Sequence, residues 1–249
     1  GSYSFSSTVV NKAGLEEAIN NASDINEFFY TADSYQDLKE ALEKAQEVQN
    51  NKDATAEQVQ QATDLLNSAI ENLVPIAQDG SESNPYQIND IDDITLFANT
   101  VNSGSSFEGK YVELTTDLDL SGMDWMPIGT ESSMTTGDGF AGVFNGNGHV
   151  ISNVNITDSS EYATFGLFGT ISGTVRNLGV ENVTVNSGSV DCRSGGFAGT
   201  LTTGGFIDNC YVVKANVTAT SRVAAGFVGQ SYNGTIQNSY VKDVVTSGG

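Results

Sequence analysis

The chain has 249 residues, enough for two domains, and a formal net charge of −21 from 31 acidic and 10 basic residues. Acidic residues outnumber basic ones in both halves, so the total hides no basic patch. Nucleic-acid binding requires clustered lysines and arginines, so we expect no nucleic-acid partner. No run of about 18 apolar residues is present, and we expect no membrane insertion.

Residues 12–75 are predicted to form a bundle of three helices. Apolar residues recur there at spacings of three and four, the pattern of amphipathic helices. Thr55 and Gln58 form a capping box before the third helix, and Pro75 ends that helix. Three helices of this length with short connections predict an up-down-up bundle.

This segment is similar to a known family. Its motifs resemble the FIVAR module of bacterial cell-surface proteins, over residues 14–74. The resemblance implies an extracellular multidomain protein, with only a loose association with sugar binding. It is carried by Tyr30-Thr-Ala-Asp-Ser34, Leu38, Ala41-Leu42, Ala45, Ala54-Thr55, Ala69-Ile70 and Leu73.

Residues 76–84 are small and polar and are interpreted as a linker. The second domain is then expected over residues 85–249. A short helix is predicted near 91–101, and the alternating stretch 111–120 is predicted to be a strand. Asp90 and its acidic neighbours are expected to cap the short helix.

A four-residue block recurs through the second domain. Its first glycines are 24, 30 and 30 residues apart, and the sequence between blocks favours strands and turns. A period of this size indicates stacked units, so the fold class is a helical bundle followed by a parallel β-helix with one coil per repeat. The blocks are Gly142-Val-Phe-Asn145, Gly166-Leu-Phe-Gly169, Gly196-Phe-Ala-Gly199 and Gly226-Phe-Val-Gly229.

Aligning the blocks predicts columns of equivalent residues. Two inward apolar columns and one structural ladder of asparagines at a turn are expected. The columns are Ile151, Val175, Ile207 and Ile236, then Ile156, Val180, Val212 and Val241, and the ladder is Asn153, Asn177, Asn209 and Asn238. Four Asn-x-Thr motifs are interpreted as products of the repeat rather than as glycosylation sites. They begin at Asn155, Asn182, Asn216 and Asn233.

The second domain resembles GLUG-motif β-helices over nearly all of residues 85–249. The resemblance implies a right-handed coil in an extracellular bacterial protein, including modules attached to adhesins and to immunoglobulin-A peptidases, and names no ligand. It is carried in order by Tyr86-Gln-Ile88, Phe97-Ala98, Asn102-Ser-Gly104, Phe107-Glu-Gly109, residues 114–120, Pro127-Ile-Gly129, Phe144-Asn-Gly-Asn-Gly-His149, Gly166-Leu-Phe-Gly169 and Asn209-Cys-Tyr211.

No catalytic residue, cofactor or metal site is predicted. His149 is the only histidine, so neither a zinc site nor a Ser-His-Asp triad has its ligands or partners nearby. Asp117 and Asp119 face the same side of a strand and are interpreted as turn caps rather than paired catalytic carboxylates or a calcium site. Cys192 and Cys210 are interpreted as buried thiols in preference to a disulfide.

Four residues are candidates for binding. Tyr211 and Tyr240 are expected to stack outward one coil apart, either as a contact platform for sugar or protein or as a plain stabilising ladder. Arg193 and Arg222 are expected to be exposed on one face of adjacent coils and could together bind a uronate carboxylate, although pairing with Asp191 or Glu161 is favoured.

These observations predict a non-catalytic, secreted or surface-attached, adhesin-like module for extracellular glycan or host protein. The alternative is an accessory or spacer region of a larger extracellular enzyme whose catalytic domain lies elsewhere. Because Val245-Thr-Ser-Gly-Gly249 ends on a turn that precedes blocks elsewhere in the repeat, we also expect further coils of the same chain as a partner of the last coil.

Overall fold

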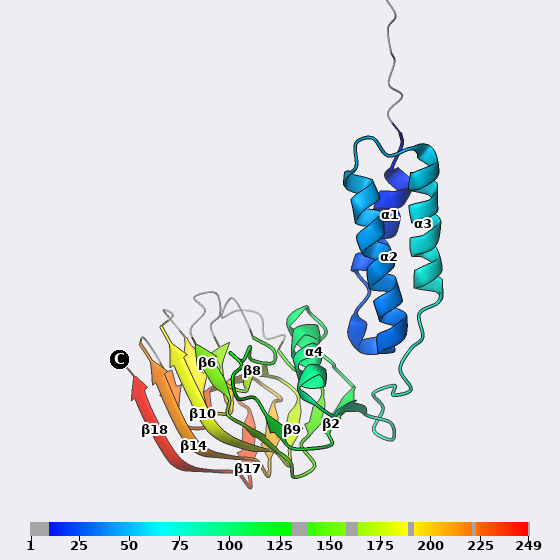
Figure 1. The fold of residues 1–249 in the computed structure, drawn as a ribbon. Helices are drawn as coiled ribbons and strands as arrows, with labels where there is room; N and C mark the ends of the chain where they lie inside the picture. The colour runs from blue at the N-terminus through cyan, green and yellow to red at the C-terminus, as the bar shows by residue number, and fades with distance from the viewer. Residues whose placement is uncertain (1–9, 131–138, 158–163, 189–191, 221–222, 249) are drawn as a thin grey trace, which may run out of the picture. The chain divides into compact units, whose positions relative to one another are not determined.

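A computed structural model describes residues 10–130, 139–157, 164–188, 192–220 and 223–248 (Figure 1). The chain divides into two compact units, Gly1–Ala77 and Gln78–Gly249. The first is helical and the second is a parallel β-solenoid of about five turns. The predicted fold class, a helical bundle followed by a parallel β-helix, is therefore confirmed.

The helical unit contains α1 (Ala13–Ser23), the short 3-10 helix η1 (Glu27–Phe29), α2 (Ala32–Asn50) and α3 (Ala56–Glu71). The predicted capping box is present at the start of α3, where Thr55 and Gln58 hydrogen-bond to each other's backbone. The apolar faces meet in one core of buried residues: Leu15, Ala18, Ala22, Leu38, Ala45, Ala54, Val59, Ala62 and Leu66.

The boundary between the units differs from the predicted linker. Residues 75–76 belong to the helical unit, because Ile76 N donates to Phe29 O at 3.1 Å beside a bridge between Tyr30 and Pro75. Residues 78–84 belong to the solenoid, where Gly80 O accepts from Tyr111 N at 2.9 Å. The small residues expected to form a linker instead form a turn that packs against the first coil, because Gly80 adopts φ +70° directly against the ring of Tyr86.

Among the described residues of the solenoid, every strand pair is parallel and the strands form four sheets. The first sheet contains β1 (Tyr86–Ile88), β2 (Tyr111–Leu114), β4 (Val143–Asn145), β9 (Thr174–Arg176), β13 (Phe206–Asp208) and β17 (Thr235–Gln237). The second contains β3 (Leu118–Asp119), β5 (Val150–Ser152), β10 (Gly179–Ser187), β14 (Tyr211–Ala219) and β18 (Tyr240–Gly248), and β6 (Asn155–Thr157) pairs with β10. Two smaller sheets contain β7 (Thr164–Phe165), β11 (Arg193–Gly195) and β15 (Val223–Ala225), and β8 (Phe168–Ile171), β12 (Ala198–Leu201) and β16 (Val228–Ser231).

The register confirms three of the four predicted block positions and corrects the first. Gly166-Leu-Phe-Gly169 and its two successors stack on one another, because Phe168 pairs with Ala198 and Ala198 pairs with Val228. Gly142-Val-Phe-Asn145 does not join them, because Phe144 pairs with Val175 in the first sheet. Its resemblance to the later blocks is a coincidence of residue type.

The predicted inward columns change accordingly in the first full coil. Ile151 pairs with Val180 rather than Val175, so each sheet has its own continuous column. The first is Tyr86, Val112, Phe144, Val175, Ile207 and Ile236, and the second is Leu118, Ile151, Val180, Val212 and Val241. Neighbours in the second column lie 29 to 33 residues apart, which defines the length of a coil.

Helix α4 (Ile91–Asn102) covers the beginning of the solenoid core (Figure 1). Asp90 caps it as predicted, since its Oδ1 accepts from Asp93 N at 2.9 Å. The buried ring of Phe97 lies 5.6 Å from Phe140 and 5.9 Å from Phe144, measured between ring centroids. The helix therefore buries apolar groups of the first coils that no preceding coil covers.

Phe197 tests the contribution of the interior stack to stability. Its fully buried ring lies 5.9 Å from the ring of Phe168 and 4.9 Å from that of Phe227. We expect Phe197→Ala to lower the free energy of unfolding of the solenoid by about 3–5 kcal/mol, because it leaves a cavity. Phe206→Ala, at a half-buried position of β13, is the matched control and should cost less than half as much in urea unfolding. Equal losses would contradict the proposed packing.

Candidate functional site

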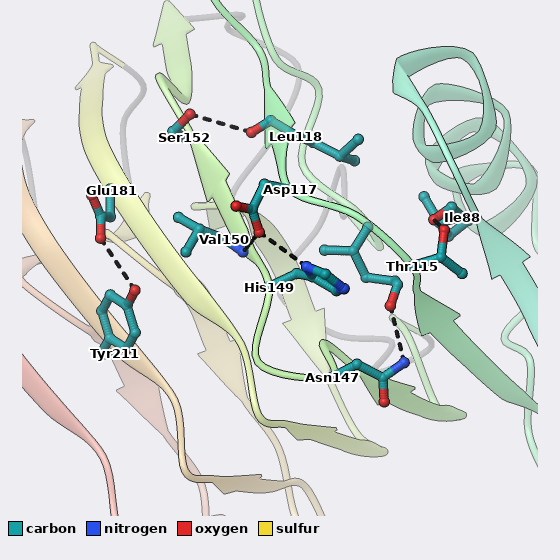
Figure 2. Close-up of polar contacts among 11 residues, drawn as sticks. Ile88, Thr115, Asp117, Leu118, Asn147, His149, Val150, Ser152, Glu181 and Tyr211 are labelled. Carbon is teal, nitrogen blue, oxygen red and sulfur yellow. Dashed lines mark hydrogen bonds and ion pairs between the residues drawn. The ribbon is translucent and has the colours of Figure 1, made fainter.

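The predicted tyrosine stack is present on the outer face of the second sheet. Tyr211 and Tyr240 are paired in register, with ring centroids 5.2 Å apart and planes inclined by 11°. The Tyr211 hydroxyl donates to Glu181 Oε1 at 3.1 Å (Figure 2). Its ring also lies over Gly179 of the preceding coil, where a Cβ would collide with it. Both faces of the Tyr211 ring and its hydroxyl are therefore occupied, which favours the ladder interpretation over a contact platform.

The Tyr211 phenol is correspondingly hard to ionise. Burial raises its pKa to about 12, with smaller contributions from the hydrogen bond to the Glu181 carboxylate and from the charge of that group. Tyr240, which is 55% exposed, is the member of the pair whose ring faces solvent. The stack thus contributes mainly to cohesion between coils.

Asp117 and Asp119 hold the following coil in the way that turn caps do. Asp117 Oδ1 accepts from Val150 N at 2.9 Å and lies 3.0 Å from His149 Nδ1 (Figure 2). Asp119 Oδ1 accepts from Asn153 Nδ2 at 2.7 Å and from Ser121 N at 2.9 Å. These hydrogen bonds lower the pKa of both carboxyl groups, with Val150 N–H as the largest cause for Asp117 and the Asn153 amide for Asp119.

Arg193 is not the exposed arginine that the sequence analysis predicts. It is 5% exposed, because Gln230 and Tyr232 of the next coil cover it. Its Nη2 donates to the Tyr232 hydroxyl at 3.1 Å, and its Nε donates to Gln230 Oε1. Arg193 pairs in register with Val223, whereas Arg222, Asp191 and Glu161 lie outside the described residues.

Both cysteines are buried free thiols. Cys192 Sγ lies 3.1 Å from Ser187 Oγ in the interior. Burial raises the pKa of Cys210 to about 12, so that thiol stays protonated at neutral pH and is a poor nucleophile. The structure therefore agrees with the buried-thiol interpretation.

Two corners of the coil use the same left-handed backbone conformation. At the first, called here the ladder corner, Asn177, Asn209 and Asn238 adopt φ of 56°, 53° and 51°. Their side-chain amides are hydrogen-bonded from coil to coil: Asn209 Nδ2 donates to Asn177 Oδ1 at 2.9 Å, and Asn238 Nδ2 donates to Asp208 Oδ1 at 2.7 Å. This is the predicted asparagine ladder, with amides bound within the fold.

The second corner lies within the long strands β10, β14 and β18 and is called here the open corner. Asn153, Asn182, Lys214 and Asp243 occupy it with φ between 54° and 59°. Asn153 belongs to this corner rather than to the ladder, because its neighbour Ser152 pairs with Glu181. Aligning the repeated blocks in the sequence predicted Asn153 at the ladder corner, because that alignment misplaced the first block.

A shallow groove of about 550 Å³ follows the open corner across successive coils. Within the described parts of the chain, the side chains of Asn155, Asn182 and Asn216 make no hydrogen bond, in contrast to the amides of the ladder corner. The groove, called here the corner groove, is lined by Ser121, Gly122, Asn153, Val154, Asn155, Asn182, Val183, Thr184, Lys214, Ala215, Asn216 and Asp243.

Sequence reasoning missed this groove, although a signal was present. Asn155, Asn182 and Asn216 each begin an Asn-x-Thr motif, interpreted above as a by-product of the repeat. Their shared location depends on the register of β6, β10 and β14, which only the structure supplies. Amide and hydroxyl groups along a groove can donate and accept hydrogen bonds to a polar ligand.

One domain family and several known proteins resemble parts of this chain. Residues 11–74 match the FIVAR domain, a module associated with cell surfaces, which confirms that predicted resemblance. Halomucin of Haloquadratum walsbyi is 30% identical over 130 residues, covering 49% of this chain and 1% of that protein. A protein of Evansella cellulosilytica named as a Gly-rich membrane protein is 34% identical over 103 residues, covering 40% of this chain and 11% of that one.

A solved structure is also similar, a chain from Bacteroides ovatus described as an immunoglobulin A1 protease. It shares 24% identity with a TM-score of 0.45, covering 66% of this chain and 58% of that one. This chain thus spans only a small part of the curated relatives and somewhat over half of the solved one. None of the helices described here is long and apolar enough to cross a membrane.

The two corners predict different losses of stability when a side-chain amide is removed. Asn209→Gly and Asn182→Gly both keep a residue that tolerates positive φ, so they share the same backbone cost. We expect Asn209→Gly to be less stable than Asn182→Gly by about 1 kcal/mol in urea unfolding, because only the former loses a hydrogen bond. Equal stabilities would show that the ladder amides contribute nothing.

The Asp117 cap predicts a pH-dependent contribution to the free energy of unfolding. Its folded-state pKa is lowered from 3.8, so the stabilisation is present above that value and is lost as pH falls through the lowered pKa. Asp117→Asn should therefore be less stable than the wild-type chain at neutral pH and should match it once the carboxyl is protonated in both states. A loss for Asp117→Asn that persists in acid would rule out the charged cap.

Proposed function

We propose that this chain is a non-catalytic binding module of an extracellular or cell-surface protein, and that the corner groove is its ligand site. The FIVAR match at residues 11–74 supports the location, since that module is associated with cell surfaces. An adhesin-like role follows from a rigid solenoid that displays a polar groove on its outer surface. The ligand class is extracellular glycan or host protein.

The observation that carries this proposal is the contrast between the two corners. Asn177, Asn209 and Asn182 share the same backbone conformation, yet the amides of Asn177 and Asn209 are hydrogen-bonded within the fold, whereas that of Asn182 has no partner among the described residues. The amide of Asn216, two residues after the open corner, likewise has none, and Asn153 at the first coil is the bonded exception. An asparagine at positive φ is explained by backbone geometry alone, but Asn216 has no such requirement. Its amide is available to a ligand.

The placement of the other polar groups supports a non-catalytic role. Asp117 and Asp119 are each bound to a backbone N–H of the fold, and His149 Nδ1 is held by Asp117. None of these groups lines the corner groove. The amides and the hydroxyl of the groove support hydrogen bonding to a ligand, and Lys214 and Asp243 add one charge of each sign.

The repeated blocks support a finer assignment to GLUG-motif solenoids. Gly166, Gly196 and Gly226 occupy equivalent places between the short strands of the two smaller sheets. The Cβ of any other residue at Gly166 would approach backbone atoms of Ala198 to within 2.8 Å, so the motif is explained by close approach of neighbouring coils. In this proposal the motif builds the solenoid, and the residues between motifs provide the ligand site.

A second candidate function is an accessory or spacer region of a larger extracellular enzyme. The observation that favours it is size, because this chain matches only 1% and 11% of the lengths of its two curated relatives. Such a region would show no ligand binding that depends on the corner groove.

Binding measurements on the whole chain separate these candidates. A glycan array and a panel of immobilised extracellular matrix proteins serve as probes, with the double variant Asn182→Gly and Asn216→Ala. Asn186→Ala, an exposed asparagine on β10 outside the groove, is the matched control. We expect binding to at least one probe that the double variant weakens about tenfold and the control does not, provided that urea unfolding shows both to be folded. No binding, or binding insensitive to the double variant, would overturn the proposed site.

A further inference from the structure

The lining of the corner groove repeats from coil to coil. Asn155 pairs in register with Thr184, and Thr184 pairs with Asn216, so polar side chains form one row across three strands. Asn153, Asn182, Lys214 and Asp243 form a second row beside it. Hydrogen-bonded strands lie about 4.8 Å apart, so both rows present polar groups at that interval along the solenoid axis.

This interval distinguishes among extended polymers. An extended peptide advances about 3.3 Å per residue, and alternate residues face the same side, so it would lose register with the rows after two coils. A β-linked chain of pyranose sugars advances by nearly one coil per sugar. Each sugar could therefore meet one coil, and although successive sugars present opposite faces, the amides can donate to or accept from the hydroxyls of either face.

The chemistry of the rows also fits sugars. Each amide of Asn155, Asn182 and Asn216 offers an acceptor oxygen and two donor hydrogens, and the hydroxyl of Thr184 offers both roles. Sugar hydroxyls are likewise donors and acceptors at once. The apolar lining residues Val154, Val183 and Ala215 are buried, so the groove lacks the protruding apolar or aromatic pockets that anchor most peptides.

The charges at the groove favour a neutral chain. Lys214 and Asp243 occupy the same row on adjacent coils, so their charges offset each other locally. The chain as a whole carries a formal charge of −21, which disfavours approach of polyuronates and other polyanions.

Resting on the proposed function, we infer that the corner groove binds a neutral, β-linked polysaccharide that lies parallel to the solenoid axis, with one sugar per coil. The rows of Asn153 to Asp243 span four coils, so about four sugars fill the groove.

Side-chain amide NMR of the ¹⁵N-labelled whole chain tests this inference. The probes are cello-, manno- and xylo-oligosaccharides of two to six sugars, a hexagalacturonate and a Gly-Ser hexapeptide. We expect at least one neutral series to shift the amide signals of Asn182 and Asn216 while leaving Asn177 and Asn209 unchanged. Affinity should rise with length and level off at about four sugars. The double variant Asn182→Gly and Asn216→Ala should weaken it about tenfold, and Asn186→Ala should not.

Each other outcome overturns the inference and identifies what failed. Shifts by the peptide alone, or tighter binding of hexagalacturonate, would leave the groove as a ligand site but exclude a neutral glycan. No length dependence beyond two sugars would exclude a chain that follows the axis. If no probe shifts the amide signals of Asn182 or Asn216, the inference fails. The proposed function fails as well only if the glycan array and the matrix-protein panel also show no binding that depends on the groove.

Discussion

Parallel pairing in register between successive coils constrains the rest of the solenoid. Because each strand meets the same strand of the next coil, every inward residue joins a column such as Ile151, Val180 and Val212, and every corner recurs at one position. A residue type suited to one coil is therefore suited to its neighbours. Glycines at close approaches and residues at positive φ are the local requirements of this stacking, and α4 closes the core at the first coils.

The same constraint explains how a repeat can carry a site. At both corners the backbone bends through a residue at positive φ, and asparagine suits that conformation. At the ladder corner the amides of Asn177 and Asn209 bond along the axis and stabilise the stack. At the open corner the chain continues within β10 and β14, and the amides of Asn182 and Asn216 line a groove instead. In the proposed function, one residue type thus serves stability at the ladder corner and recognition in the corner groove.

Much of the fold was predictable because its signals are local. Helical periodicity and the Thr55 capping box located α3, and the later blocks located the stacked turns. The first coil was misaligned because Gly142-Val-Phe-Asn145 resembles a block in residue type, whereas Phe144 belongs to another sheet. Arg193 looked exposed because nothing local reveals that Gln230 and Tyr232, more than a coil away in sequence, cover it. The corner groove depends on the register between coils, which no single coil encodes, so neither it nor the burial of Arg193 could be derived from local pattern.

The central claim is that the amides of Asn177 and Asn209 at the ladder corner are bound within the fold, whereas those of Asn182 and Asn216, which line the corner groove, are not. Asn153, at the first coil of the open corner, differs from them because its amide is bonded to Asp119. Hydrogen exchange of the asparagine side-chain amides, resolved by NMR on the unliganded chain, measures this directly. The account predicts slowed exchange for Asn177 and Asn209, and exchange at the rate of a solvent-exposed amide for Asn182 and Asn216. Equal protection at the two corners would contradict the distinction between them and remove the physical basis of the corner groove as a ligand site.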